Sequence, residues 1–386
     1  MNVIFLSPHF PPNFRHFVRG LRDAGATVLG LGDEPFDNLH SELRSKFHEY
    51  YRVSDMENYD ALLRGVAHLT FKWGKIDRLD SLNEHWLETE AALRTDFNIF
   101  GIRQDWIENI KRKSYMKQRF REAGVAVATG RVCVTPEETK AFVKEVGYPI
   151  VAKPDIGVGA AKTYKITDDF ELDFYLRDKL PVEYILEEFI KGDIVTFDGL
   201  TDKDGKVLFV ASHRYSRGVM ETVNEDGDIF YYSERVIPDA LMQAGMASLK
   251  AFDVRERFFH LEFFDIDGKI MALEANIRPP GGLTVDMFNY ANDMDVYQEW
   301  ANVLVKGKFS AKADRPYHTV YIGRKDHLSY ALSHQQVLEQ FGGMVCHSER
   351  IMSIFSRAIG NYGYILRHPE LEPVIAAAEA VIQKAS

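Results

Sequence analysis

The segment from Phe258 to Gly282, FFHLEFFDIDGKIMALEANIRPPGG, constrains the fold more than any other part of the 386-residue chain. Two apolar runs flank an Asp-Ile-Asp-Gly turn, and this pattern predicts a β-hairpin. Glu274, Asn276 and Arg278 are spaced by two, so an extended strand places all three on one face. Buried charges are costly unless they have partners. We therefore expect a charged ligand to cover this face.

A second acid of the hairpin, Glu262, lies twelve positions before Glu274 on the partner strand. A two-residue turn at Asp267-Gly268 would pair Glu262 with Leu273 and put the two acids on opposite faces. We therefore predict a turn of three or five residues, or a β-bulge, that brings the carboxylates together. Two carboxylates and the Asn276 oxygen suit Mg²⁺, which prefers oxygen ligands and shares substrate phosphates. The alternative is a solvated hairpin face with incidental charges.

A lysine-ended strand followed by a glycine-containing loop is predicted for residues 148–162, YPIVAKPDIGVGAAK. The strand ends near Lys153, and the loop contains Gly157 and Gly159. Backbone N–H groups of such a loop, together with the lysine charge, suit a polyphosphate. A surface lysine beside a turn explains the pattern equally well.

An acidic pair, Glu187-Glu188, interrupts the apolar strand pattern of residues 185–192, ILEEFIKG. Backbone groups of this strand could contact an adenine edge, with the Glu187 carboxylate accepting from the exocyclic amine. An edge strand with a solvated acidic pair is the alternative for this segment alone.

In this order along the chain, the three segments resemble the ATP-grasp superfamily, and most closely its carboxylate–amine ligases, which include the L-amino-acid ligases. The resemblance covers roughly residues 110–305 and implies an α/β fold in three parts. These parts are an N-terminal Rossmann-like parallel α/β domain (1–109), a two-lobed ATP-grasp domain (110–310, with its small lobe at about 125–190) and a small C-terminal α/β subdomain (311–386). A β-α-β pattern at the start of the chain agrees with the first part.

The resemblance also implies roles for individual residues. Lys113 and Lys153 resemble the lysines that contact phosphate, and Glu187 resembles the acid that contacts adenine. Glu188 and Ile190 would offer backbone hydrogen bonds to the ring. The residues that resemble the magnesium-binding set are Glu262, Glu274 and Asn276.

Other positions complete this comparison with the superfamily. Arg278 resembles the arginine that faces the phosphate and the reacting carboxylate, and Gly281 and Gly282 would let the chain approach the substrate. The acid that commonly binds ribose is replaced by Ile194. Asp193, one residue earlier, is the substitute candidate.

The implied reaction uses ATP and Mg²⁺, with Mn²⁺ as an alternative ion. A small-molecule carboxylate would be activated as an acyl phosphate, and an amine would displace phosphate to form an amide or peptide bond. Arg214 and Arg217, near strand ends, are candidates to bind a substrate carboxylate, with an ordinary surface role as the alternative. One alternative function keeps the ATP site but catalyses phosphoryl transfer or carboxylation. Another is a regulatory protein that binds nucleotide without turnover.

Charge and composition bound the remaining choices. Lysine and arginine number 47 against 57 aspartate and glutamate, a net charge of −10, which argues against nucleic-acid and anionic-membrane partners. No apolar run approaches the roughly 18–20 residues of a membrane span. We expect a cytoplasmic enzyme, and a homodimer is possible.

A basic helix is predicted over residues 106–123, and we expect its charges to form a solvated face. Those charges are Lys111, Arg112, Lys113, Lys117, Arg119 and Arg121.

Overall fold

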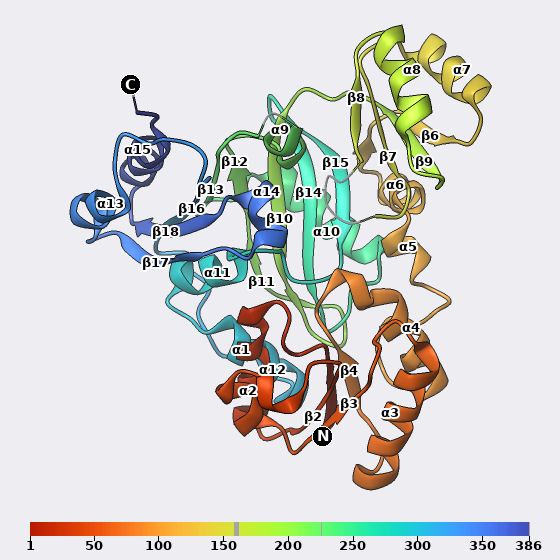
Figure 1. The fold of residues 1–386 in the computed structure, drawn as a ribbon, viewed down its shortest axis with the longest axis vertical. Helices are drawn as coiled ribbons and strands as arrows, with labels where there is room; N and C mark the ends of the chain where they lie inside the picture. Colours follow the sequence, from red (N-terminus) through yellow and green to blue (C-terminus); the bar gives the residue numbers. More distant parts are fainter. Residues whose placement is uncertain (158–161, 225, 386) are drawn as a thin grey trace.

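The computed structural model describes residues 1–157, 162–224 and 226–385. In this part of the chain the strands form two four-stranded sheets and one ten-stranded sheet, and the predicted α/β fold class is confirmed. Figure 1 shows the N-terminal sheet at the bottom, the small lobe at the upper right and the C-terminal segment at the left. No helix among the described residues combines the length and the apolar character needed to cross a membrane.

The N-terminal sheet is parallel, with strand order β3-β2-β1-β4. Val3 packs with α1 and with the distant helix α12 (Val296–Lys306), whereas Ile4 packs on the opposite face with α3. Both faces are therefore buried, as expected for a parallel sheet. The elements are β1 (Asn2–Leu6), η1 (Pro12–Phe14), α1 (Arg15–Ala24), β2 (Thr27–Gly32), η2 (Phe36–Asn38), α2 (Ser41–Lys46), β3 (Glu49–Arg52), α3 (Tyr59–Trp73), β4 (Arg78–Asp80), η3 (Glu84–Trp86) and α4 (Leu87–Asp96).

The basic helix predicted over residues 106–123 is in fact two helices, α5 (Glu108–Lys111) and α6 (Lys113–Glu122). Arg112 between them is extended, with φ −88° and ψ 119°. The backbone N–H of Lys113 donates to the Asp155 carbonyl (2.9 Å), and that of Ser114 donates to the Asp155 carboxylate (2.8 Å). Asp155 thus satisfies the free N–H groups at the start of α6. The break depends on this long-range contact, which local periodicity does not contain.

The small lobe is an antiparallel sheet with strand order β6-β9-β7-β8. Phe142 of α7 and Leu172 of α8 pack onto its apolar face. The elements are β6 (Gly130–Cys133), α7 (Pro136–Val146), β7 (Ile150–Pro154), β8 (Tyr164–Ile166), α8 (Asp169–Asp178) and β9 (Tyr184–Glu188). The short strand β5 (Ala126–Val127) pairs with β15 instead. The sheet of the small lobe therefore begins at Gly130.

The central sheet has the strand order β17-β18-β16-β13-β12-β10-β14-β15-β5, and β11 pairs with β10. The three strands after residue 311 continue this sheet beyond β13, so the C-terminal segment shares it with the residues before it. Its strands are β10 (Asp193–Thr201), β11 (Val207–Ala211), β12 (His213–Tyr215), β13 (Ile229–Ser233), β14 (Phe258–Ile266), β15 (Lys269–Asn276), β16 (His318–Arg324), β17 (Val345–Arg350) and β18 (Tyr362–His368). Its further helices are α9 (Val219–Asn224), α10 (Asp239–Ala251), α11 (Thr284–Asn292), α13 (His334–Phe341), α14 (Ser353–Ile359) and α15 (Leu371–Ile382).

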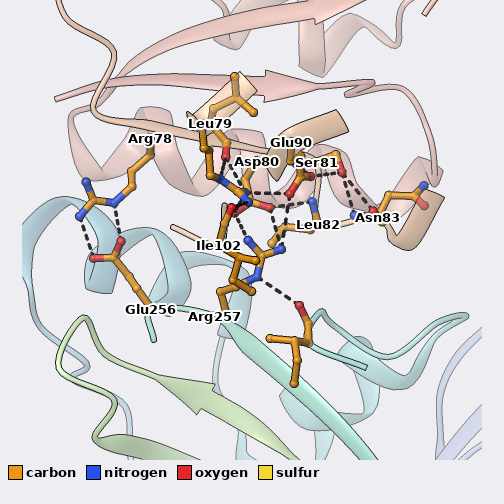
Figure 2. A network of polar contacts seen from close by, with 12 residues as sticks. Arg78, Leu79, Asp80, Ser81, Leu82, Asn83, Glu90, Ile102, Glu256 and Arg257 are labelled. Atoms are coloured by element: carbon orange, nitrogen blue, oxygen red, sulfur yellow. Dashed lines mark hydrogen bonds and ion pairs between the residues drawn. The ribbon is translucent and has the colours of Figure 1, made fainter. Parts of the chain in front are cut away.

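A buried ionic network joins the N-terminal sheet to the central sheet (Figure 2). The Arg257 guanidinium, beside β14, lies 3.1 Å from Asp80 of β4 and 3.6 Å from Glu90 of α4. Glu90 is fully buried and accepts a hydrogen bond from the Ser81 N–H (2.6 Å). Burial and the Asp80 carboxylate raise the pKa of Glu90, and Arg94 and Arg257 oppose this shift. The buried Glu90 and the partly buried Asp80 therefore depend on two guanidinium groups for their charge balance.

We predict that Arg257→Met lowers the free energy of unfolding by about 3–5 kcal/mol, because it leaves buried carboxylates short of one positive partner. Arg255→Met is the control, since Arg255 is half exposed and its ion pair within the described residues is with the exposed Asp253. That variant should stay within about 1 kcal/mol of the parent. Urea unfolding measures both values. Equal unfolding midpoints for the two variants would contradict a stabilising role for the network.

Candidate functional site

The hairpin of β14 and β15 brings the two predicted metal-binding acids together. Its turn is the two-residue Asp267-Gly268, with positive φ at both positions (51° and 86°). The register then shifts, so that Glu262 pairs with Glu274 while Phe263 pairs with Ala272. The extra residue on β15 is Leu273, which forms a β-bulge. Of the two predicted alternatives, the bulge is confirmed, and the turn keeps its two residues.

Positively charged groups and amides surround the paired carboxylates. Lys113 Nζ lies 3.2 Å from Glu274 Oε1, and His260 Nε2 lies 3.2 Å from Glu262 Oε1. The Asn276 amide donates to Glu262 Oε1 at 3.4 Å. Burial opposes the charged form of His260, but the Asp198 and Glu262 carboxylates outweigh burial and raise the pKa of His260 to about 9.

The donor set of this hairpin fits a hard cation that keeps other ligands. Among the residues that the structure describes, no three His, Cys, Asp or Glu side chains gather closely enough to hold a metal ion by themselves. Two carboxylates and one amide are, however, the usual protein share of a Mg²⁺ site that also takes phosphate oxygens. The Asn276 oxygen accepts from Arg278 (3.4 Å). A half-turn of the Asn276 amide directs this oxygen toward Glu262.

A cavity of about 340 Å³ opens beside the hairpin, between the small lobe and the central sheet. In Figure 1 the strands β7 and β9 of the small lobe lie to the right of β14 and β15 of the central sheet. The cavity combines acidic, basic and apolar walls. Its lining includes Lys113, Val151, Lys153, Gly157, Glu187, Glu188, Ile190, Asp193, Tyr215, Arg217, Glu262, Phe264, Leu273 and Glu274.

Glu187 lies between two lysines in the wall of the cavity. Its carboxylate is 2.7 Å from both Lys153 Nζ and Lys117 Nζ, and all three side chains are buried. Burial alone would raise the pKa of Glu187, but the two ammonium groups outweigh it and lower the pKa to about 2. The expected contact between this carboxylate and adenine stays a prediction, because Glu187 also lines the cavity. The structure uses Glu187 to hold the lysines.

Lys117 was missed as a site residue, and the expectation of a solvated basic face on this helix is wrong for three residues. Lys111, Lys113 and Lys117 are all buried, with at most 6% of their surface exposed. Lys113 and Lys117 are four positions apart, so they share one face of α6. This spacing was the available signal, because a predicted phosphate-binding Lys113 places Lys117 on the same side.

The segment that follows Glu187 leads from β9 of the small lobe to β10 of the central sheet. The side chain and the N–H of Glu188 both bond to the backbone of Thr129 (2.7 and 2.9 Å), so the Glu188 N–H is not available to a base. Ile190 lines the cavity. Asp193 also lines it, and the carboxylate of Asp193 is 2.9 Å from Arg214. The Gly157 carbonyl accepts from Lys113 (3.2 Å), and Gly159 lies outside the described residues.

The two predicted substrate arginines differ in their surroundings. Arg217 lines the cavity. Arg214 does not, and its guanidinium lies within 3.0 Å of three carboxylates. Neighbouring side chains of a strand point to opposite faces, which explains why Tyr215 faces the cavity and Arg214 does not. The expected substrate contact of Arg214 therefore lacks support from this geometry. Its three partners are Asp193, Glu234 and Asp265.

Arg278, Gly281 and Gly282 follow the hairpin outside the cavity lining. The Arg278 Nε and Nη2 atoms lie 3.0 and 2.5 Å from Oε2 of Glu84, at the end of the N-terminal sheet. The Gly282 carbonyl accepts from Asn13 (3.3 Å). The N-terminal domain thus contacts the predicted catalytic arginine through Glu84, to which the sequence analysis gave no role.

We predict that Lys117→Met lowers the free energy of unfolding by about 3 kcal/mol, because it leaves the buried Glu187 with one positive partner. Arg121→Met, on the exposed side of the same helix, should change it by less than about 0.5 kcal/mol. Guanidinium unfolding gives both values. A Lys117→Met protein as stable as the parent would show that Lys153 alone balances Glu187.

Comparisons with known proteins agree with this architecture. No family model matches the chain. The L-arginine-specific L-amino acid ligase of Bacillus subtilis is 24% identical over 266 residues, which cover 66% of this chain and 64% of that protein. An L-amino acid ligase structure from Bacillus licheniformis has a TM-score of 0.74 at 15% identity and covers 100% of this chain and 99% of that chain.

A carboxylase is also similar in structure. The biotin carboxylase domain of 2-oxoglutarate carboxylase from Hydrogenobacter thermophilus, in complex with MgADP and bicarbonate, has a TM-score of 0.69 at 16% identity, and the match covers 98% of this chain and 89% of that chain. The chain spans less than two thirds of the length of the first curated relatives that it matches. The chain therefore has the fold of this L-amino acid ligase and of this carboxylase, which agrees with the resemblance to ATP-grasp carboxylate–amine ligases that its motifs predicted.

Proposed function

We propose that this protein is an ATP- and Mg²⁺-dependent ligase that joins a small-molecule carboxylate to an amine and releases ADP and phosphate. One observation carries the proposal: the wall of the cavity combines a cluster of buried lysines with a pair of facing carboxylates. A nucleotide polyphosphate with a divalent cation has the complementary charges. A ligand with charge of only one sign would leave one half of the wall without a new partner.

The lysines would bind the phosphates of the nucleotide. Lys153 is held by Glu187 at the end of β7, and Lys113 by Glu274 and the Gly157 carbonyl at the start of α6. Fixed positions matter here, because phosphoryl transfer depends on positioning and on electrostatic stabilisation of the transferring group. Val151, Phe264 and other apolar side chains of the lining would pack against the base.

Glu262, Glu274 and Asn276 would hold the magnesium ion, for which Mn²⁺ is the alternative. When bound, the ion would neutralise charge on the phosphates. Lys113 lies beside Glu274. Once the ion occupies that carboxylate, the Lys113 ammonium group can turn toward a phosphate oxygen. The ribose would lie near Asp193, where the segment between the lobes enters β10.

The reaction would proceed in two displacements. A substrate carboxylate oxygen attacks the γ-phosphorus, the bond to the bridging oxygen breaks, and ADP leaves with the electron pair. The amine nitrogen then attacks the acyl carbon, phosphate leaves, and the nitrogen loses a proton to solvent. Arg278 and Arg217 would stabilise negative charge on the transferring group and on the carboxylate.

The similar proteins indicate which substrates to try first. Two of them are L-amino acid ligases, so pairs of L-amino acids are the first candidates for carboxylate and amine. The carboxylase among the similar structures has MgADP and bicarbonate bound. This makes bicarbonate-dependent turnover the second candidate function.

The experiment is a screen of ADP release over pairs of L-amino acids, with mass spectrometry of the products. ADP formation that requires both amino acids, together with a condensed product, supports the ligase. ADP formation that requires bicarbonate would assign a carboxylase. Nucleotide binding without ADP formation across the panel would leave a regulatory protein.

We predict that Glu274→Gln lowers substrate-dependent ADP formation by about 100-fold, because loss of one metal carboxylate removes about 3 kcal/mol of charge stabilisation. Asp267→Asn is the matched control, since it neutralises an exposed acid at the turn of the same hairpin and should keep the parent rate. Thermal unfolding of both variants checks that they fold. Equal rates for Glu274→Gln and the parent would show that the metal assignment is wrong.

Location and assembly remain predictions. Cys133 and Cys346 are free thiols, and a cytoplasmic location would supply both ATP and the reducing conditions that keep them so. The oligomeric state is a separate question, and the molecular mass of the purified protein in solution distinguishes a monomer from a homodimer.

A further inference from the structure

A line of buried polar side chains runs from the middle of the central sheet to Glu262. Asp198 of β10 has no exposed surface and pairs across the strands with His260 of β14. Asp198 Oδ1 accepts from His260 Nδ1 at 2.6 Å. Its other oxygen, Oδ2, accepts from Thr196 Oγ1 (2.6 Å) and from His213 Nδ1 (2.9 Å). Asp198 is therefore fixed by three donors, and His260 is one of them.

The second ring nitrogen of His260 reaches the candidate metal site. Residues 260 and 262 lie on one face of β14, and His260 Nε2 is 3.2 Å from Glu262 Oε1. His260 is 6% exposed, so its ring cannot swing into solvent to make other contacts. In the described part of the chain, the contacts of the Glu262 carboxylate from His260 and Asn276 both use Oε1. They leave Oε2 to face another partner.

His213 provides an internal comparison. It is also buried and also donates to Asp198, but its ring lies against Phe288 and Tyr231 and outside the lining of the cavity. Its Nε2 atom has no hydrogen-bond partner among the described residues. The two histidines thus share one carboxylate and a similar burial, and only His260 contacts a candidate metal ligand.

We propose that His260, held by Asp198, is a positioning residue that orients the Glu262 carboxylate toward the divalent cation. The inference rests on the proposed function, since it gives this site its metal. Groups that hydrogen-bond to a metal ligand restrict its rotation, and their loss commonly lowers metal affinity 10–100-fold. A carboxylate that accepts from His260 through one oxygen presents the other oxygen to the ion.

The test measures binding of Mn²⁺ in the presence of ADP, by the electron paramagnetic resonance signal of the free ion. His260→Asn keeps a donor near the Nδ1 position for Asp198 but loses the donor to Glu262. It should weaken Mn²⁺ binding at least about 10-fold. His260→Gln places its amide nitrogen near the Nε2 position and should recover most of the affinity. His213→Asn should bind Mn²⁺ within about twofold of the parent.

Three results would overturn the proposal. His260→Asn that binds Mn²⁺ as tightly as the parent would remove the role of His260. Equal losses in His260→Asn and His213→Asn would assign the effect to general disruption around Asp198. A parent protein that binds no Mn²⁺ with ADP would overturn this inference and the proposed function together, whereas the first two results overturn the inference alone.

Unfolding midpoints of all variants accompany the binding data. If His260→Asn fails to fold, Asp198→Asn tests the same step, because it weakens the partner of the ring at constant volume. It should lower Mn²⁺ affinity and raise the Mg²⁺ concentration needed for half-maximal rate. Mn²⁺ affinity equal to the parent in a folded Asp198→Asn protein would count against the proposal.

Discussion

The cross-strand pairing of Glu262 with Glu274 is the constraint on which the rest of the site depends. Like charges placed opposite each other on one sheet face destabilise the sheet, and both carboxylates here are only partly exposed. The bulge at Leu273 enforces this pairing despite the repulsion. The protein balances it with one positive group for each acid, Lys113 for Glu274 and His260 for Glu262. Each of these groups comes from a different part of the fold.

The N-terminal domain also supplies acidic partners to arginines that flank the hairpin. The end of β4 and the segment after it form ion pairs with residues that flank the hairpin: Asp80 of β4 pairs with Arg257, and Glu84 pairs with Arg278. Ligand sites of parallel sheets lie at the carboxyl ends of the strands. Glu84 stands just beyond that end of β4. The sheet is thus used to support a side chain of the neighbouring domain.

The sequence allowed the hairpin and the meeting of Glu262 with Glu274 to be predicted, because strand periodicity and turn length decide which side chains share a face. It left a longer turn and a bulge as alternatives, and the structure has the bulge. The break at Arg112 could not be predicted, since it depends on Asp155, more than forty positions away. Lys117 was misjudged for a related reason. Charge alone does not distinguish a solvated face from a buried one, and only the acid on another strand, Glu187, makes burial of this lysine favourable.

The arrangement of charges also argues for the kind of ligand. Glu187 has two ammonium partners, Lys117 and Lys153. These three buried side chains together carry a net charge of one positive unit beside the cavity. Lys113 and Glu274, in contrast, neutralise each other. An anion alone would compete with Glu274 for Lys113 and leave the carboxylate without a partner. A cation alone would compete with Lys113 for Glu274 and leave the ammonium group without a partner. A polyphosphate that arrives with a divalent cation replaces both halves of the pair at once. Because preorganised charges of this kind need little rearrangement, they bind such a ligand at low cost in reorganisation.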